Sequence, residues 1–105
     1  MTTSLIIPAF NEEEAIGLVI EEYYPFVDEI IVVDDGSKDK TYEIASHYQD
    51  AKVNVIAHTQ NQGKVGALLT GVRKSTGDII IFTDADCTYP ARYIPDFLSE
   101  LNRGA

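Results

Sequence analysis

Short apolar runs alternate along this chain with segments of helical periodicity. Four largely apolar runs predict strands, at residues 4–7, 29–33, 53–57 and 78–82. Their apolar residues are consecutive rather than alternating with polar ones, a pattern typical of strands that are buried on both faces of a parallel sheet.

Each predicted strand is followed by a segment with a helical repeat of apolar or small residues at positions i, i+3, i+4 and i+7, which predicts four amphipathic helices. The four faces are Ile16, Val19, Ile20 and Tyr23; Thr41, Ile44, Ala45 and Tyr48; Val65, Leu68, Leu69 and Val72; and Ile94, Phe97, Leu98 and Leu101. Asn11, with Glu14 three residues later, resembles a capping box for the first helix. Ser37 or Asp39 is placed to cap the second helix.

The order βαβαβαβα predicts one α/β domain over residues 1–105. Right-handed crossovers place the helices on both faces of a parallel sheet, and we expect a Rossmann-like sheet with strand order 3-2-1-4. Ligands of such sheets bind beyond the carboxyl ends of the strands, where the chain reverses direction. Three polar segments are expected to meet there, at residues 8–13, 34–37 and 84–86.

Two aspartates one residue apart follow the last predicted strand. Asp84 and Asp86 point the same way if the strand continues, because side chains alternate along a strand. Carboxylates this close repel each other unless a cation lies between them, and oxygen ligands of this kind suit Mg²⁺ or Mn²⁺. The pattern predicts a divalent-cation site. The alternative is that one aspartate caps the next helix and the other is solvated.

Other polar residues leave two interpretations open. Asp34 and Asp35 precede Gly36, so they either form a turn that caps the next helix or provide a carboxylate for a base N–H or a ribose hydroxyl. Lys64 is either a solvated first-turn residue or a phosphate ligand. Because no glycine-rich phosphate loop is present, a nucleotide would be held by side chains and a metal.

The remaining candidates and the composition narrow the function further. His47 and His58 have no partner at ligand spacing and are expected at the surface or at an edge. The net charge of −9 argues against nucleic acid or an anionic membrane surface as a direct partner. No run approaches the ~20 apolar residues of a membrane span. The single cysteine, Cys87, and an N-terminus without a signal peptide predict a cytoplasmic location.

Four segments in this order resemble the nucleotide-binding half of family 2 glycosyltransferases, which have the GT-A fold. They are Ile7-Pro8-Ala9-Phe10-Asn11-Glu12-Glu13, Val32 to Thr41 with Asp34-Asp35-Gly36-Ser37, Asn61-Gln62-Gly63-Lys64-Val65-Gly66-Ala67, and Gly77-Asp78 through Thr83-Asp84-Ala85-Asp86. Within that family the chain is most similar to the polyprenyl-phosphate sugar transferases, such as dolichyl-phosphate mannose or glucose synthases.

The resemblance implies a role for each segment. The residues that would line the nucleotide pocket are Pro8, Ala9, Asn11 and Glu12. Asp34 would contact the base, with Asp35 nearby. Asp84 and Ala85 would lie on the ribose and diphosphate side, and Asp86 would bind the metal. Mannose synthases often carry a glutamine two residues beyond the second aspartate, whereas this chain has threonine there.

The resemblance also implies a larger enzyme, because family members continue beyond the helix that follows the two aspartates. We therefore expect a donor-binding domain that is part of a longer, inverting glycosyltransferase and is inactive alone. It would take a nucleoside-diphosphate sugar and a divalent cation, with a polyprenyl phosphate as acceptor at the cytoplasmic face of a membrane. The expected strand order leaves residues 79–82 at a sheet edge without lysine or proline, which predicts a homodimer through that edge.

Two alternatives remain. Asp84 to Thr88 resembles the Asp-x-Asp-x-Thr motif of haloacid-dehalogenase-type phosphatases, although that motif opens its domain and here only one helix follows it. A receiver-like Mg²⁺-binding module without catalysis would need its acidic pair after the first strand, where this chain has Asn11, Glu12 and Glu13.

Overall fold

The computed structural model describes residues 2–84 as a layered α/β domain. Its strands are β1 (Thr3–Ala9), β2 (Glu29–Asp34), β3 (Val53–Ala57) and β4 (Ile79–Phe82). Its helices are α1 (Ile16–Tyr23), the short 3-10 helix η1 (Tyr24–Phe26), α2 (Thr41–Ser46) and α3 (Gly63–Lys74). The fourth predicted helix lies outside the described residues.

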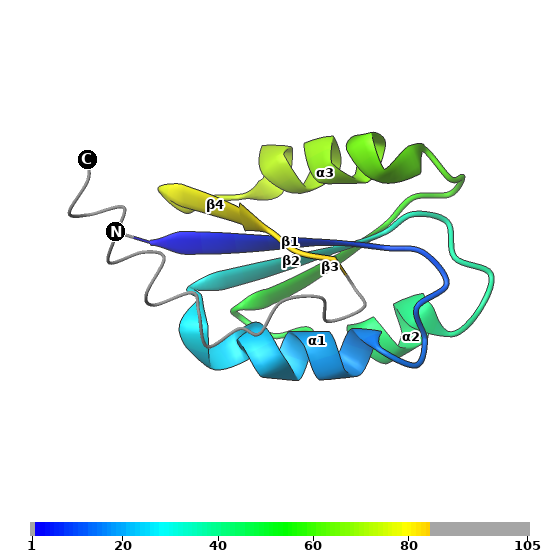
Figure 1. Ribbon diagram of the computed structural model, residues 1–105, viewed down its shortest axis with the longest axis horizontal. Coiled ribbons are helices and arrows are strands. Elements are labelled where there is room, and N and C mark those ends of the chain that lie inside the picture. Colours follow the sequence, from blue (N-terminus) through cyan, green and yellow to red (C-terminus); the bar gives the residue numbers. More distant parts are fainter. Residues whose placement is uncertain (1, 85–105) are drawn as a thin grey trace.

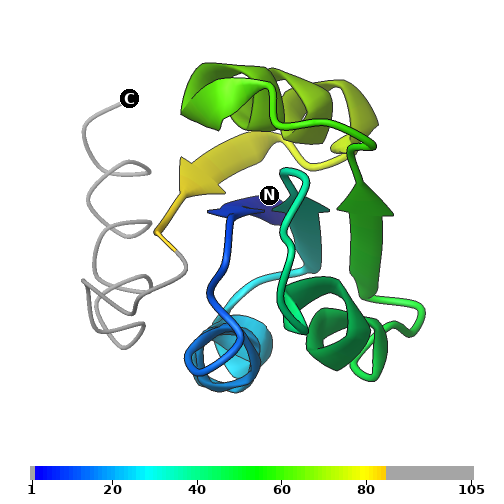
Figure 2. The same cartoon turned by 90° about the vertical axis from the view of Figure 1, so that its right-hand side faces the viewer.

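The four strands form one parallel sheet in the order β3-β2-β1-β4, which confirms the predicted topology. The register pairs Ile7 with Val32 and Val32 with Val55, and on the other side of β1 it pairs Ile6 with Phe82. Helix α3 covers one face of the sheet, and α1 and α2 cover the other (Figures 1 and 2). Among residues 2–84 no helix is long and apolar enough to span a bilayer.

Each central strand contributes to two cores. Leu5 and Val32 belong to the cluster on the α1 and α2 side, whereas Ile6, Ile31 and Val33 belong to the cluster under α3. All five are fully buried. Burial on both faces explains why the strands are apolar at consecutive positions.

Helix α1 buries its predicted face, but the face predicted for α3 is partly wrong. Val65 is 70% exposed and Leu69 is 49% exposed, whereas Ala67 and Gly71 are buried. The cause is a close approach to the sheet, because a Cβ atom on Gly71 would lie 2.4 Å from Cγ2 of Ile6. Small residues therefore face the sheet and the larger ones are displaced to the flanks.

The loops after β1 and β2 are locked together where the site is expected. The capping box predicted for Asn11 does not form, because its Oδ1 accepts the N–H of Lys38 (2.9 Å) and its own N–H donates to Oγ of Ser37 (2.8 Å). Asn11 takes a left-handed conformation, with φ of 53°. The N-cap residue of α2 is Lys40 rather than Ser37 or Asp39, although Asp39 accepts the N–H of Thr41 in the first turn (2.9 Å).

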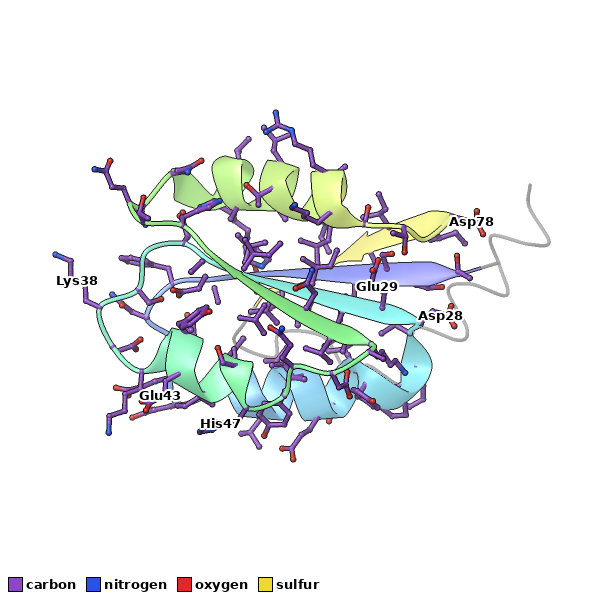
Figure 3. The ribbon with its side chains drawn as sticks, turned by 180° about the vertical axis from the view of Figure 1, so that it is seen from behind. Asp28, Glu29, Lys38, Glu43, His47 and Asp78 are labelled. Carbon is purple, nitrogen blue, oxygen red and sulfur yellow. The ribbon has the colours of Figure 1, made fainter. Side chains whose placement is uncertain are left out.

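The two ends of the sheet differ in chemistry. Asp28, Glu29 and Asp78 lie together at the amino ends of the strands, on the side away from Lys38 (Figure 3). Glu29 and Asp78 accept hydrogen bonds from residues in and before β1. Oε1 of Glu29 accepts the hydroxyl of Ser4 (2.7 Å), and Oδ2 of Asp78 accepts the N–H of Thr2 (3.1 Å). These bonds connect the chain at the amino end of β1 to the starts of β2 and β4, whereas the predicted site residues lie at the opposite end of the sheet.

Candidate functional site

A cavity of about 450 Å³ opens at the carboxyl ends of the strands, between the β1–α1 loop and the start of α3. The residues that line it are Pro8, Ala9, Phe10, Glu12, Asp35, Asn61, Gly63, Lys64, Ala67 and Asp84. The structure thus brings together most of the predicted site residues. Asn11 and Asp34 are not among the lining residues, and Ala85 and Asp86 lie outside the described part of the chain.

Sequence reasoning missed four lining residues, which are Phe10, Asn61, Gly63 and Ala67. Gly63 has φ of +85°, a conformation that glycine adopts without strain, and it starts α3. Its neighbour Asn61 donates from Nδ2 to the backbone carbonyl of Asp35 (3.2 Å). The signal that was available is the polar segment 61–64, which leads into a helix whose N-terminus faces the switch point.

Asp35 joins the end of β2 to the start of α3. Its carboxylate accepts the backbone N–H groups of Gln62 (2.8 Å) and Gly63 (2.9 Å), and Nδ1 of His58 lies 2.8 Å from its Oδ1. Gln62 supplies no side-chain cap to α3, so Asp35 caps that helix from another strand. The predicted capping role is therefore real, but it serves α3 rather than α2.

These contacts set the charge state of Asp35. Burial raises its pKa, but the hydrogen bonds from His58, Gln62 and Gly63 outweigh burial and lower the pKa below its ordinary value of 3.8. A carboxyl group whose pKa is lower in the folded state than in the unfolded state stabilises the fold at every pH above the unfolded pKa. This stabilisation is lost as the pH falls through the folded pKa.

We predict that Asp35→Asn removes part of the acid sensitivity of this fold. The free energy of unfolding should fall less steeply below about pH 4 than it does in the unmodified chain, because one carboxylate that prefers to stay ionised is gone. Urea unfolding measured at several pH values tests this. Glu22→Gln, which removes an exposed carboxylate of α1, is the control, and equal slopes for Asp35→Asn and the unmodified chain would contradict the assignment.

The side chain of Asp34 is buried on the face of the sheet opposite to α3. It follows Ile30 and Val32 at even spacing, which directs it toward the α1 and α2 face. It is 3% exposed, and its Oδ1 has no hydrogen-bond partner among the described residues. A buried carboxylate oxygen without a donor is costly and uncommon, and a bound water, ion or ligand would satisfy it.

Asp84 follows β4 and is held at the cavity by its neighbours. Thr83 is buried, its N–H donates to the carbonyl of Ile6 (3.2 Å), and its Oγ1 lies 3.1 Å from the Tyr23 hydroxyl. Nζ of Lys64 donates to Oδ1 of Asp84 (2.5 Å), between side chains that are 64% and 40% exposed. An exposed pair of this kind contributes little to stability, so a ligand can replace it at small cost.

The metal prediction concerns Asp84 and Asp86. Within residues 2–84 no cluster of three or more histidine, cysteine or acidic side chains could hold a metal ion, and Asp86 lies outside that range. Asp84 nevertheless suits a metal ligand, because its carboxylate lies at the cavity wall and already forms an ion pair with the cationic Lys64. A diphosphate would supply the further oxygens that one or two carboxylates lack.

The topology, the cavity and the acidic ends of the strands agree with one known family. The family model described as Glycosyl transferase family 2 matches residues 4–105. The chain belongs to this family. Membership accounts for the Asp84 to Asp86 motif in place of the phosphatase and receiver-like interpretations.

Two relatives show how the chain compares with longer sugar transferases. The bactoprenol glucosyl transferase of Shigella phage SfX is 39% identical over 113 residues, which cover 100% of this chain and 37% of the phage protein. The dolichol-phosphate mannosyltransferase of Pyrococcus furiosus is 33% identical over 114 residues, which cover 100% of this chain and 31% of that protein. This family 2 chain thus spans about a third of the length of these relatives.

A solved structure supports the fold. The glucosyl-3-phosphoglycerate synthase of Mycobacterium tuberculosis, in complex with Mn²⁺, UDP-glucose and phosphoglyceric acid, aligns with a TM-score of 0.79 and 32% sequence identity. The alignment covers 95% of this chain and 39% of the synthase. The βαβαβαβ arrangement is therefore part of a GT-A fold.

Proposed function

We propose that this chain binds a nucleoside-diphosphate sugar together with Mg²⁺ or Mn²⁺, as the donor-binding part of a glycosyltransferase. The observation that carries the proposal is the cavity at the carboxyl ends of the strands, which has carboxylates and a lysine on its wall. A chain of −9 net charge needs a cation to hold a diphosphate. The related synthase, whose structure contains Mn²⁺ and UDP-glucose, supports this assignment.

Each part of the cavity has a task in this proposal. Asp84 and Asp86 would hold the divalent cation, which would supply positive charge to offset the charge that develops on the departing nucleoside diphosphate. Lys64 lines the same cavity as Asp84 and would place its ammonium group beside the diphosphate. Glu12 and the β1–α1 loop would form the wall of the nucleotide pocket. Asp34 does not line the cavity, but it precedes the lining residue Asp35 and would accept a hydrogen bond from the base.

For the acceptor we propose a polyprenyl phosphate, with inversion at the anomeric carbon. The names of the bactoprenol and dolichol relatives support this choice. A phosphate oxygen is already ionised at neutral pH, so the transfer needs no strong general base. A lipid phosphate would place the whole enzyme at the cytoplasmic face of a membrane.

The donor assignment is tested by thermal unfolding with UDP or GDP and Mn²⁺. A ligand at 100 times its dissociation constant adds about 2.7 kcal/mol to the stability of the folded state, so the melting temperature should rise by roughly 10–20 °C. Each nucleotide without metal, and Mn²⁺ alone, are the controls. The proposal fails if neither nucleotide raises the melting temperature beyond the effect of Mn²⁺ alone.

We also propose that two copies of the chain pair through β4. Within the described residues β4 is an edge strand that pairs only with β1, and Phe82 at its end is 52% exposed. An apolar edge without lysine or proline is a surface on which a second strand can add. Symmetric, antiparallel pairing of two β4 strands would satisfy the free backbone groups.

Phe82→Glu should shift the chain from dimer to monomer in static light scattering at tens of micromolar. Phe82 is the better choice for this test than Ile80, because Ile80 packs against the core under α3 and a charge there would also destabilise the fold. Val65→Glu, which changes an exposed residue of α3, is the matched control and should leave the mass unchanged. A monodisperse monomer of the unmodified chain would refute the dimer.

A further inference from the structure

His58 lies at the end of an edge strand of the sheet, as expected, but its side chain is enclosed between three elements. It follows β3, and its side chain is 8% exposed. Its Nδ1 lies 2.8 Å from Oδ1 of Asp35, at the end of β2, and its Nε2 lies 2.8 Å from Oγ1 of Thr70, in α3. The imidazole thus bridges the cavity-lining aspartate and the helix that starts at the cavity.

The direction of the first of these hydrogen bonds follows from the partners of Asp35. Both carboxylate oxygens accept backbone N–H groups, from Gln62 at Oδ1 and from Gly63 at Oδ2, and these bonds favour the ionised carboxylate, which acts as an acceptor only. Nδ1 of His58 must therefore carry the proton and donate.

The second bond permits two states of the ring. The Thr70 hydroxyl also lies 3.1 Å from the carbonyl of Gly66 and has a single proton to donate. If that proton goes to Nε2, His58 is neutral, and if it goes to Gly66, Nε2 donates to Thr70 and His58 is a cation. In both states Nδ1–H donates to Asp35, so this contact does not depend on the charge of the ring.

We propose that His58 is a positioning residue of the donor site, which holds the Asp35 carboxylate in a fixed orientation toward the nucleoside side of the cavity. The proposal rests on the proposed function. Oδ1 of Asp35 is filled by His58 and Gln62, whereas Oδ2 accepts only Gly63 among the described residues and has one acceptor position left at the cavity wall. Without the Nδ1–H donor, the carboxylate is held by the two backbone groups alone.

The metal side of the cavity is held independently of His58. Asp84 is placed by β4 and by Thr83, whose partners are Ile6 and Tyr23. Loss of the His58 contact should therefore weaken binding of a whole nucleotide and leave binding of inorganic diphosphate with Mn²⁺ unchanged. A purely structural role would weaken both.

Two variants of similar size separate the two hydrogen bonds. His58→Asn keeps an N–H donor near the position of Nδ1, whereas His58→Gln places its amide near Nε2 and loses the bond to Asp35. We expect the affinity for UDP with Mn²⁺, measured by titration calorimetry, to fall roughly tenfold in His58→Gln. We expect His58→Asn, and Thr70→Val as a control, to stay within about threefold, and diphosphate affinity to stay within about twofold throughout.

A measurement on the unmodified chain keeps the test independent of mutant folding. Long-range ¹H–¹⁵N spectra should show Nδ1 of His58 protonated, and the ring signals should shift on saturation with UDP and Mn²⁺ while those of His47, exposed at the end of α2, do not. An unprotonated Nδ1, unchanged ring signals on saturation, or equal UDP affinity in His58→Gln and the unmodified chain overturns the inference. If the unmodified chain binds neither UDP nor GDP, the proposed function fails, and protonation of Nδ1 decides whether His58 pairs with Asp35 as inferred.

Discussion

Asp86→Ala should abolish Mn²⁺-dependent binding of UDP or GDP to this chain. The second aspartate of the motif would contribute a hard oxygen ligand, and without it Asp84 would be the one carboxylate of the motif left to hold the cation. Without a cation, the negative nucleoside diphosphate is repelled by a chain of −9 net charge. We therefore expect the mutation to abolish binding of both the metal and the nucleotide. Titration calorimetry with and without Mn²⁺ measures this.

Glu43→Ala is the control for the metal prediction, because it removes one negative charge from the exposed side of α2 and leaves the cavity intact (Figure 3). Its affinity should match that of the unmodified chain. Asp84→Ala should also weaken binding, since it removes the carboxylate that the structure places at the cavity wall. If Asp86→Ala and the unmodified chain bind the nucleotide equally in the presence of Mn²⁺, the metal is held elsewhere.

The strand order was predictable because it depends on patterns that can be recognised in the sequence itself. Consecutive apolar residues from Ile30 to Val33 require cover on both faces, and this requires a parallel sheet with crossover helices. The meeting of the β1, β2 and β4 ends then follows from topology alone. Predicting that Pro8, Glu12, Asp35 and Asp84 share a cavity needed no knowledge of side-chain packing.

The face of α3 was not predictable in this way. Periodicity favoured Val65 and Leu69 as buried residues, since both are larger and more apolar than Ala67 and Gly71. Burial of the small residues depends on how closely α3 approaches Ile6, a distance that belongs to the assembled sheet. The local sequence pattern is overridden here by packing against β1, since Gly71 meets Ile6, which lies 65 residues earlier in the sequence.

The contacts of Asp35 and His58 were hidden for a related reason. Sequence reasoning paired Asp35 with the next helix, whereas its carboxylate caps a helix that begins at Gly63, 28 residues later. His58 has no ligand-spaced neighbour in the sequence, and its two partners, Asp35 and Thr70, lie on different elements. Side-chain bonds between elements that the fold brings together leave no periodic trace in a single sequence.

Asp34→Ala should separate binding from stability. Removing the carboxylate should weaken binding of UDP or GDP with Mn²⁺ by about 1–3 kcal/mol, the usual loss for a hydrogen bond to a charged group. Inorganic diphosphate with Mn²⁺ should bind as before, because it has no base. The free energy of unfolding should stay close to that of the unmodified chain. Oδ1 of Asp34 is buried without a hydrogen-bond partner among the described residues, so removing it also removes the cost of burying an unpaired oxygen.

Asp35→Ala is the matched comparison for stability, because the adjacent carboxylate caps α3 and pairs with His58. It should lower the free energy of unfolding by roughly 1–3 kcal/mol, as expected when buried donors lose their acceptor. Calorimetry and urea unfolding on both variants therefore distinguish the two roles. If Asp34→Ala weakens UDP and diphosphate equally, or destabilises the fold as much as Asp35→Ala, then Asp34 is a structural residue and the base is recognised from the Asp35 side of the sheet.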